Sequence, residues 1–269
     1  MTYEAGASSI EIGRRDRIRS GEQEVIPMGV ADRYYMQQDA QLVAEAMAAE
    51  RVAFIRKTYL HLFGAVLAFV GLTALLFRTE IPERLLAWVS TGHGWLLFLG
   101  GFMLVSWIAE RWARGSVSLG MQYLGLGVYV AAEAVIFLPI LYIATNPDFA
   151  PPNVLPIAAT LTLSIFGALT IIVLFTRKDF SFLQPALYLA GIGALLFIVA
   201  SIIFGFAVGN VFVFFMIIFA CGYILYHTSN VLHQYHTNQH VAASLALFAS
   251  VALLFWYVLR LVMALKGDE

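Results

Sequence analysis

The sequence predicts an all-α membrane protein, a bundle of seven transmembrane helices that follows a polar N-terminal arm. Hydrophobic residues make up 61% of the 269 residues and charged residues only 12%. The mean hydropathy of +0.81 is far above that of soluble domains. Seven apolar stretches reach the roughly twenty helical residues that cross ~30 Å of hydrocarbon, and glycine, proline or polar residues separate them.

The chain divides into two predicted parts. Residues 1–49 alternate arginines with acids and contain few large apolar residues, which is typical of a largely disordered arm. Residues 39–57 are rich in Ala, Gln, Glu and Val and lack Gly and Pro, which favours a lead-in helix along or into the membrane surface. Residues 50–269 form the transmembrane domain. Its predicted spans are 59–77, 95–112, 122–142, 154–175, 183–206, 211–232 and 241–265.

The distribution of Lys and Arg near the helix ends predicts a cytoplasmic N-terminus. That side then receives Arg51, Arg56, Lys57, Arg111, Arg114, Arg177 and Lys178, while the other side receives only Arg78, Arg84 and Lys266. We expect a multi-pass protein of the plasma membrane, or of the inner membrane if the source is bacterial. Seven spans place the C-terminus outside. Because Arg260 is a charged residue in the last predicted span, the alternative is a re-entrant last helix that returns the C-terminus to the cytoplasm.

Several classes of function are excluded. A net charge of -1 offers no basic excess for nucleic acid, so the lipid bilayer is the expected partner. The single cysteine, Cys221, rules out an intrachain disulfide. The sequence has neither an HExxH motif nor a GxSxG motif, and we expect no enzyme and no cofactor.

Glu133, His227 and Ser250 are polar residues within predicted spans. Burying a carboxylate in a bilayer is expensive, so Glu133 is either a structural carboxyl, protonated or hydrogen-bonded, or part of an ion or proton path. His227 is expected to face the protein interior. Ser250 serves either close helix packing or the same path.

Four histidines cluster at and after the end of the sixth span: His227, His233, His236 and His240. On a continuous helix the last three would share one face, but His227 would point nearly opposite His236. The region is predicted to be a turn whose histidines lie at the membrane interface, or form a proton-sensitive loop, because imidazole titrates near neutral pH. No metal site is expected here.

Five segments together resemble one known family, the Bax inhibitor-1 or transmembrane Bax-inhibitor-motif family. They are FIRKTYLHL at 54–62, TRKDFSFL at 176–183, GYILY at 222–226, ASLALF at 243–248 and LFWYVLR at 254–260. The resemblance extends over roughly 53–265 and leaves the N-terminal arm outside.

This resemblance implies a seven-helix fold with a central C-terminal helix and, in members studied as channels, a pH-sensitive calcium leak. It also implies an aspartate pair, at positions that this chain fills with His227 and Ser250, and a basic partner that Arg111 or Arg114 would resemble. Neither replacement supplies an anion, and calcium has little use for histidine, so calcium permeation does not follow automatically.

Two functions remain open. The first is an ion leak or ion-homeostasis protein for calcium or another cation, in which Glu133 and His227 replace the acid pair as a proton-sensitive gate. The second is a non-conducting protein that binds other membrane proteins through its arm.

Overall fold

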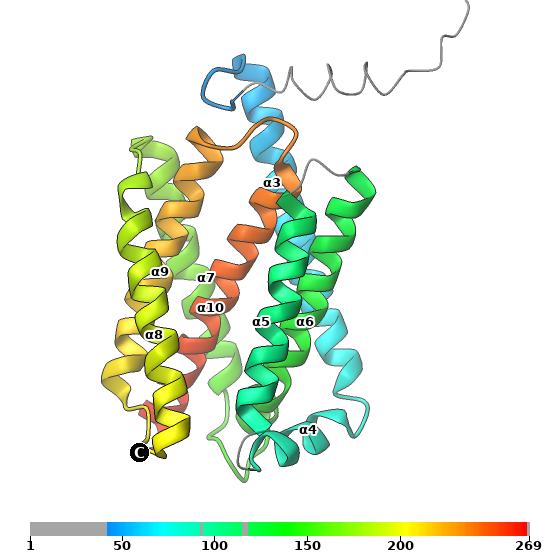
Figure 1. Cartoon of the computed structure of the whole chain (residues 1–269), viewed down its shortest axis with the longest axis vertical. Coiled ribbons are helices and arrows are strands. Elements are labelled where there is room, and N and C mark those ends of the chain that lie inside the picture. Colours follow the sequence, from blue (N-terminus) through cyan, green and yellow to red (C-terminus); the bar gives the residue numbers. More distant parts are fainter. Residues whose placement is uncertain (1–41, 92–93, 115–117, 268–269) are drawn as a thin grey trace, which may run out of the picture. The chain divides into compact units, whose positions relative to one another are not determined.

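The computed structural model describes residues 42–91, 94–114 and 118–267, and these residues are predominantly helical. Seven helices are long and apolar enough to cross a membrane, which confirms the predicted all-α bundle (Figure 1). The elements are α3 (Ala48–Leu76), α4 (Ile81–Val89), α5 (Gly94–Arg114), α6 (Leu119–Thr145), α7 (Val154–Thr176), η1 (Ser181–Leu183), α8 (Gln184–Phe204), α9 (Asn210–His233) and α10 (His240–Gly267).

The first span begins earlier than predicted. Helix α3 starts at Ala48 and continues without a break through the predicted start at Tyr59. The helix predicted at 39–57 is present from Ala48 onward and is continuous with the first span, because 48–57 contain Ala, Glu, Arg and Lys, which favour a helix. Residues 42–47 are not helical, and 39–41 lie outside the described residues. Just before α3, Val43 N donates a hydrogen bond to Tyr235 O at 3.0 Å, and Arg51 Nε donates one to Val43 O at 3.0 Å.

Helix α4 was not predicted. Pro82 was interpreted as a break after the first span, but it lies in the first turn of α4, where a helix has no need of the missing N–H. With 9 residues, α4 is too short to cross a membrane, and it packs against α5 and α6.

The C-terminal helix is central, as the family resemblance implied. Helix α10 contacts α3, α5, α6, α7 and α9, and Figure 1 shows it running obliquely between the α8–α9 and α5–α6 pairs. Its span is 67% buried, as is that of α6, against 17% for α3. Helix α10 is also continuous over 28 residues, about 42 Å at 1.5 Å per residue, so it has the length of a full span rather than a re-entrant helix.

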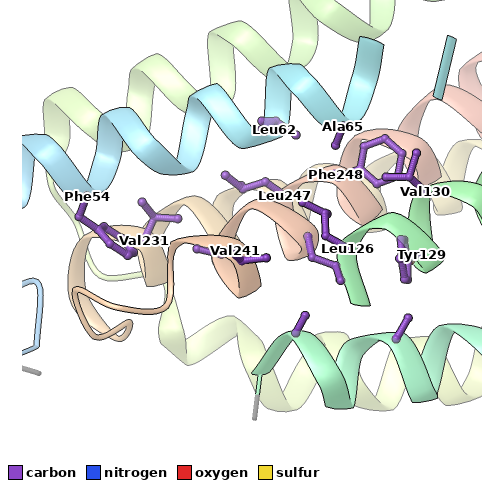
Figure 2. Packing of buried hydrophobic residues seen from close by; sticks show 14 of the residues in the cluster. Phe54, Leu62, Ala65, Leu126, Tyr129, Val130, Val231, Val241, Leu247 and Phe248 are labelled. Atoms are coloured by element: carbon purple, nitrogen blue, oxygen red, sulfur yellow. The ribbon is translucent and has the colours of Figure 1, made fainter. Parts of the chain in front are cut away.

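The core near the start of α10 is built by five helices, α3, α5, α6, α9 and α10. Leu62 of α3, Leu126 of α6 and Leu247 of α10 belong to this cluster, and Phe54 of α3 lies beside Val231 of α9 (Figure 2). This packing sets α3, α6 and α9 around α10 and so fixes which of their faces point inward.

Helices α5 and α6 approach each other closely at Gly125. A Cβ atom at this position would lie 2.6 Å from Ala109 O and 2.9 Å from Ala113 N. Small residues allow this kind of backbone contact, which transmembrane helices use in place of a hydrophobic driving force. Gly127, one half-turn further along α6, has nothing within 4 Å of its Cβ position.

We predict opposite effects of the same substitution at these two glycines. Gly125→Ala forces α5 and α6 apart and lowers the free energy of unfolding by about 1–3 kcal/mol. Gly127→Ala leaves the packing intact and raises helix propensity by up to about 1 kcal/mol. Thermal unfolding in detergent measures both, and a Gly125→Ala variant as stable as Gly127→Ala would contradict the close approach.

Candidate functional site

A cavity of about 680 Å³ lies among α5, α6, α8, α9 and α10. It is lined by four of the five residues that the sequence singled out: Arg114, Glu133, His227 and Ser250. They come from four different helices, and the central position of α10 is what brings them to one space. The fifth residue, Arg111, does not line this cavity, and its guanidinium carbon lies 5.9 Å from the centroid of the Trp107 ring.

Glu133 is the buried carboxyl of the cavity, with 6% of its surface exposed. It lies midway along α6, a helix covered by neighbours on most of its length, so a polar group here faces protein rather than lipid. Tyr129, one turn earlier on α6, is also buried and lines the same cavity. In the described part of the chain, no basic group forms a salt bridge with Glu133.

His227 contributes an imidazole from α9. Its ring stacks on Tyr223 with centroids 5.4 Å apart and is tilted against Tyr226 at 5.0 Å. Its Nδ1 atom is buried and has no hydrogen-bond partner among the described residues. Leaving such an atom unpaired costs about 1–3 kcal/mol.

Ser250 has a different role from the other lining residues. It is 3% exposed, and its hydroxyl donates a hydrogen bond to Ala246 O at 2.9 Å within α10. The hydroxyl hydrogen is therefore already used. What Ser250 supplies to the cavity is small size and a polar oxygen on the central helix.

Glu110 also lines the cavity, and the sequence interpretation did not include it. Its carboxylate forms a salt bridge with Arg114, whose Nη2 lies 3.1 Å from Glu110 Oε2 near the end of α5. The signal was present, because an acid four residues before a base on a helix forms such a pair. Arg114 is therefore paired within its own helix.

The polar residues of the cavity lie at different depths from one end of the bundle. We call the turn end the end of the bundle that carries residues 234–239, where α5 and α9 finish and α6 and α10 begin. At 1.5 Å per residue along each helix, Glu110 lies about 6 Å from this end, His227 about 9 Å, Ser250 about 15 Å and Glu133 about 21 Å. The polar lining residues thus lie between the turn end and the middle of the bundle, among apolar residues that make up most of the lining.

Beyond Glu133 the lining becomes aromatic. Trp256 of α10 stacks on Trp95 of α5 with centroids 6.1 Å apart, and meets Phe137 of α6 edge-on at 5.0 Å. All three rings line the cavity. They form an apolar barrier between the carboxyl and the end of the bundle opposite the turn end, a group we call the aromatic barrier.

Comparison with known proteins assigns the chain to a family. The sequence model of the family described as inhibitor of apoptosis-promoting Bax1 matches residues 51–267. The chain belongs to the Bax inhibitor-1 family.

Curated relatives agree with this assignment. The chain is 28% identical over 240 residues to Bax inhibitor 1 of Schizosaccharomyces pombe, covering 84% of this chain and 82% of the relative. It is 25% identical over 223 residues to Protein LIFEGUARD 3 of Arabidopsis thaliana, covering 80% and 86%. No solved structure matches the chain. In this member of the family, the buried carboxyl described above is that of Glu133 on α6.

The remaining histidines lie at the turn end, as predicted for a turn. Helix α9 finishes at His233 and α10 begins at His240. Among the residues described, no group of three His, Cys, Asp or Glu side chains is placed to hold a metal ion. His236 Nδ1 lies 3.4 Å from Gln239 Oε1, within the turn itself.

A polar contact attaches the α7–α8 loop to α9. Phe180 N donates a hydrogen bond to Ser229 Oγ at 2.9 Å, and Ser229 Oγ lies 3.3 Å from Asp179 Oδ1. The backbone N–H of Ser181 donates to Asp179 Oδ1 at 2.8 Å and, with the nearby His233, holds the pKa of this carboxyl below its usual range. Asp179 therefore stays ionised at neutral pH and keeps the start of α8 beside the cavity.

We predict that the cavity is hydrated at His227. In a Cys221→Ala background, a cysteine replacing His227 reacts with a charged, water-soluble thiol reagent at least about tenfold faster than one replacing Ile218, because only a thiolate in water reacts. Ile218 is the matched control on the same helix, since it is 71% exposed on the surface that faces lipid. Equal, slow labelling at both positions would show a dry cavity.

Proposed function

We propose that this Bax inhibitor-1 family protein is a proton-sensitive cation leak whose pathway is the cavity among α5, α6, α8, α9 and α10. The observation that carries the proposal is that Glu133 and His227 line the same cavity, one a buried carboxyl and the other an imidazole with an unpartnered nitrogen. Ionisable residues kept within a membrane are costly and usually mark ion or proton paths.

The charge of the lining favours protons or monovalent cations over calcium. Calcium takes 6–8 oxygen ligands, several of them carboxylates. The carboxyls of this cavity are Glu133 and Glu110, and Glu110 is paired with Arg114. One free carboxyl can attract a proton or a monovalent cation, whereas two would be needed to neutralise Ca²⁺.

The structure corresponds to a closed state in this proposal. The polar lining residues lie between the turn end and Glu133, and the aromatic barrier of Trp95, Phe137 and Trp256 closes the rest. Hydrophobic constrictions block ions because water and ions enter them poorly. The buried carboxyl in this cavity supports a leak over a protein that only binds other membrane proteins.

We predict that Glu133→Gln lowers cation flux in dye-loaded liposomes at least about tenfold, the change expected for a loss of about 1.4 kcal/mol of cation stabilisation. Glu83→Gln is the control, because Glu83 is exposed on α4. Glu133→Gln also flattens the dependence of flux on pH, because it removes the buried ionisable carboxyl of the cavity. Wild-type flux of protons, sodium and calcium equal to that of empty vesicles would refute the proposal.

We also predict that Trp256→Ala increases flux, because it removes the ring that contacts both other members of the aromatic barrier. Trp107→Ala is the control, since Trp107 is 62% exposed on the outer side of α5. The measurement is the same liposome assay with matched protein content. A folded Trp256→Ala variant whose flux stays at the wild-type level would remove the barrier from the gating scheme.

A further inference from the structure

Three polar aromatic side chains meet near the turn end, outside the cavity described above. His61 of α3, Tyr123 of α6 and His240 of α10 come from three helices that the core packs together. His61 Nε2 lies 2.9 Å from Tyr123 Oη, and His240 Nε2 lies 3.5 Å from the same oxygen. The two imidazole centroids are 4.9 Å apart. Two ring nitrogens thus converge on one phenol oxygen.

The orientation of His61 is fixed by its own helix. His61 Nδ1 donates a hydrogen bond to Lys57 O at 2.6 Å, so in the neutral ring the free lone pair is on Nε2 and points at Tyr123. Histidines that bind metals almost always donate their other ring N–H to a carbonyl or carboxylate in this way, which fixes the tautomer and the direction of the lone pair. His61 therefore has the second contact that a metal ligand requires.

The spacing of the three donor atoms fits a metal ion. Bonds of about 2.0–2.1 Å to Zn²⁺ or Cu²⁺ place neighbouring ligand atoms about 2.9 Å apart for a right angle and about 3.4 Å apart for a tetrahedral angle. The observed separations of 2.9 and 3.5 Å from Tyr123 Oη bracket this range. Both ring nitrogens therefore lie at a distance from the phenol oxygen that two ligands of one metal ion can adopt.

We propose that His61 Nε2, Tyr123 Oη and His240 Nε2 form a binding site for a borderline divalent transition metal, with Cu²⁺ bound more tightly than Zn²⁺. Two imidazoles and a phenolate suit these ions, and affinity rises toward copper along the first-row series. Binding replaces the phenol proton of Tyr123 by the metal, so one proton is released to solvent from this residue.

The surroundings of the site are consistent with this role. His240 is buried, and Tyr123 is 40% exposed, which leaves an opening for a water molecule as a further ligand. The charged side chain nearest in sequence, Lys57, is exposed and can turn its ammonium group away into solvent. A bound metal would cross-link α3 and α6 to the first residue of the central helix.

Copper titration of full-length protein without an affinity tag, purified in detergent, tests the proposal. We expect one Cu²⁺ per chain, an electron paramagnetic resonance spectrum with nitrogen hyperfine structure, and a visible phenolate-to-copper charge-transfer band. Tyr123→Phe keeps the ring but removes the band. His61→Gln and His240→Gln each weaken affinity, measured by competition with a chelating dye, by more than the ~10–100-fold that loss of an outer partner costs.

His236→Gln and His233→Gln are matched controls, because both histidines lie at the turn end but neither contacts Tyr123 in the described structure. They are expected to retain the stoichiometry, the band and the affinity. The proposal is overturned if copper binds without the charge-transfer band, if the band persists in Tyr123→Phe, or if His61→Gln and His240→Gln bind as tightly as the controls. Because none of these readouts involves ion flux, the result is independent of the leak function.

Discussion

Lipid cannot hydrogen-bond, and this constraint shapes the whole bundle. Backbone groups in hydrocarbon must pair within their own segment, so the spanning segments are helices, and polar side chains within them must face protein or a shared cavity. The helix that offers most interior surface is α10, which five others contact. Ser250 lies on α10 itself, and Glu133 and His227 lie on α6 and α9, which contact α10. The three residues therefore line one cavity.

The number of spans and most of their ends could be predicted from the sequence, because apolar runs of spanning length separated by breakers carry that information. The neighbours of each helix could not be predicted in the same way. Helices α6 and α10 are apolar all round, as are spans that face lipid, so no amphipathic face indicates their partners. Helix α4 was not predicted because it has only 9 residues and Pro82 in its first turn. A search for spanning segments interprets such a stretch as a loop.

The candidate site was partly predictable for the same reason. Glu133, His227 and Ser250 stand out because polar residues in apolar runs are rare, and the family resemblance points to the last two a second time. Glu110 was overlooked because an acid beside a base at a helix end is common and carries little information alone. The proximity of His61, Tyr123 and His240 depends on the packing of α3, α6 and α10, and nothing in their local sequences indicates that the three residues meet.

Within the Bax inhibitor-1 family, the resemblance implies acids on the sixth and seventh helices, whereas this chain carries its buried carboxyl on the third span. Protonation of a carboxyl changes most the contacts of the helix that holds it. In this chain that helix is α6, which contacts α3, α4, α5, α7 and α10. A charge change at Glu133 would therefore act between α6 and the central helix, rather than between the last two helices.

The unbroken course of α3 has a mechanical consequence. Its 29 residues extend about 44 Å, well beyond the ~30 Å of hydrocarbon, so the helix either tilts strongly or projects past the headgroups. In the first turn of α3, Arg51 Nε donates a hydrogen bond to Val43 O, just before the helix. Val43 N in turn donates one to Tyr235 O in the α9–α10 connection. A displacement of Val43 would therefore act both on the first turn of α3, through Arg51, and on the α9–α10 connection, through Tyr235. This connection leads directly into the central helix.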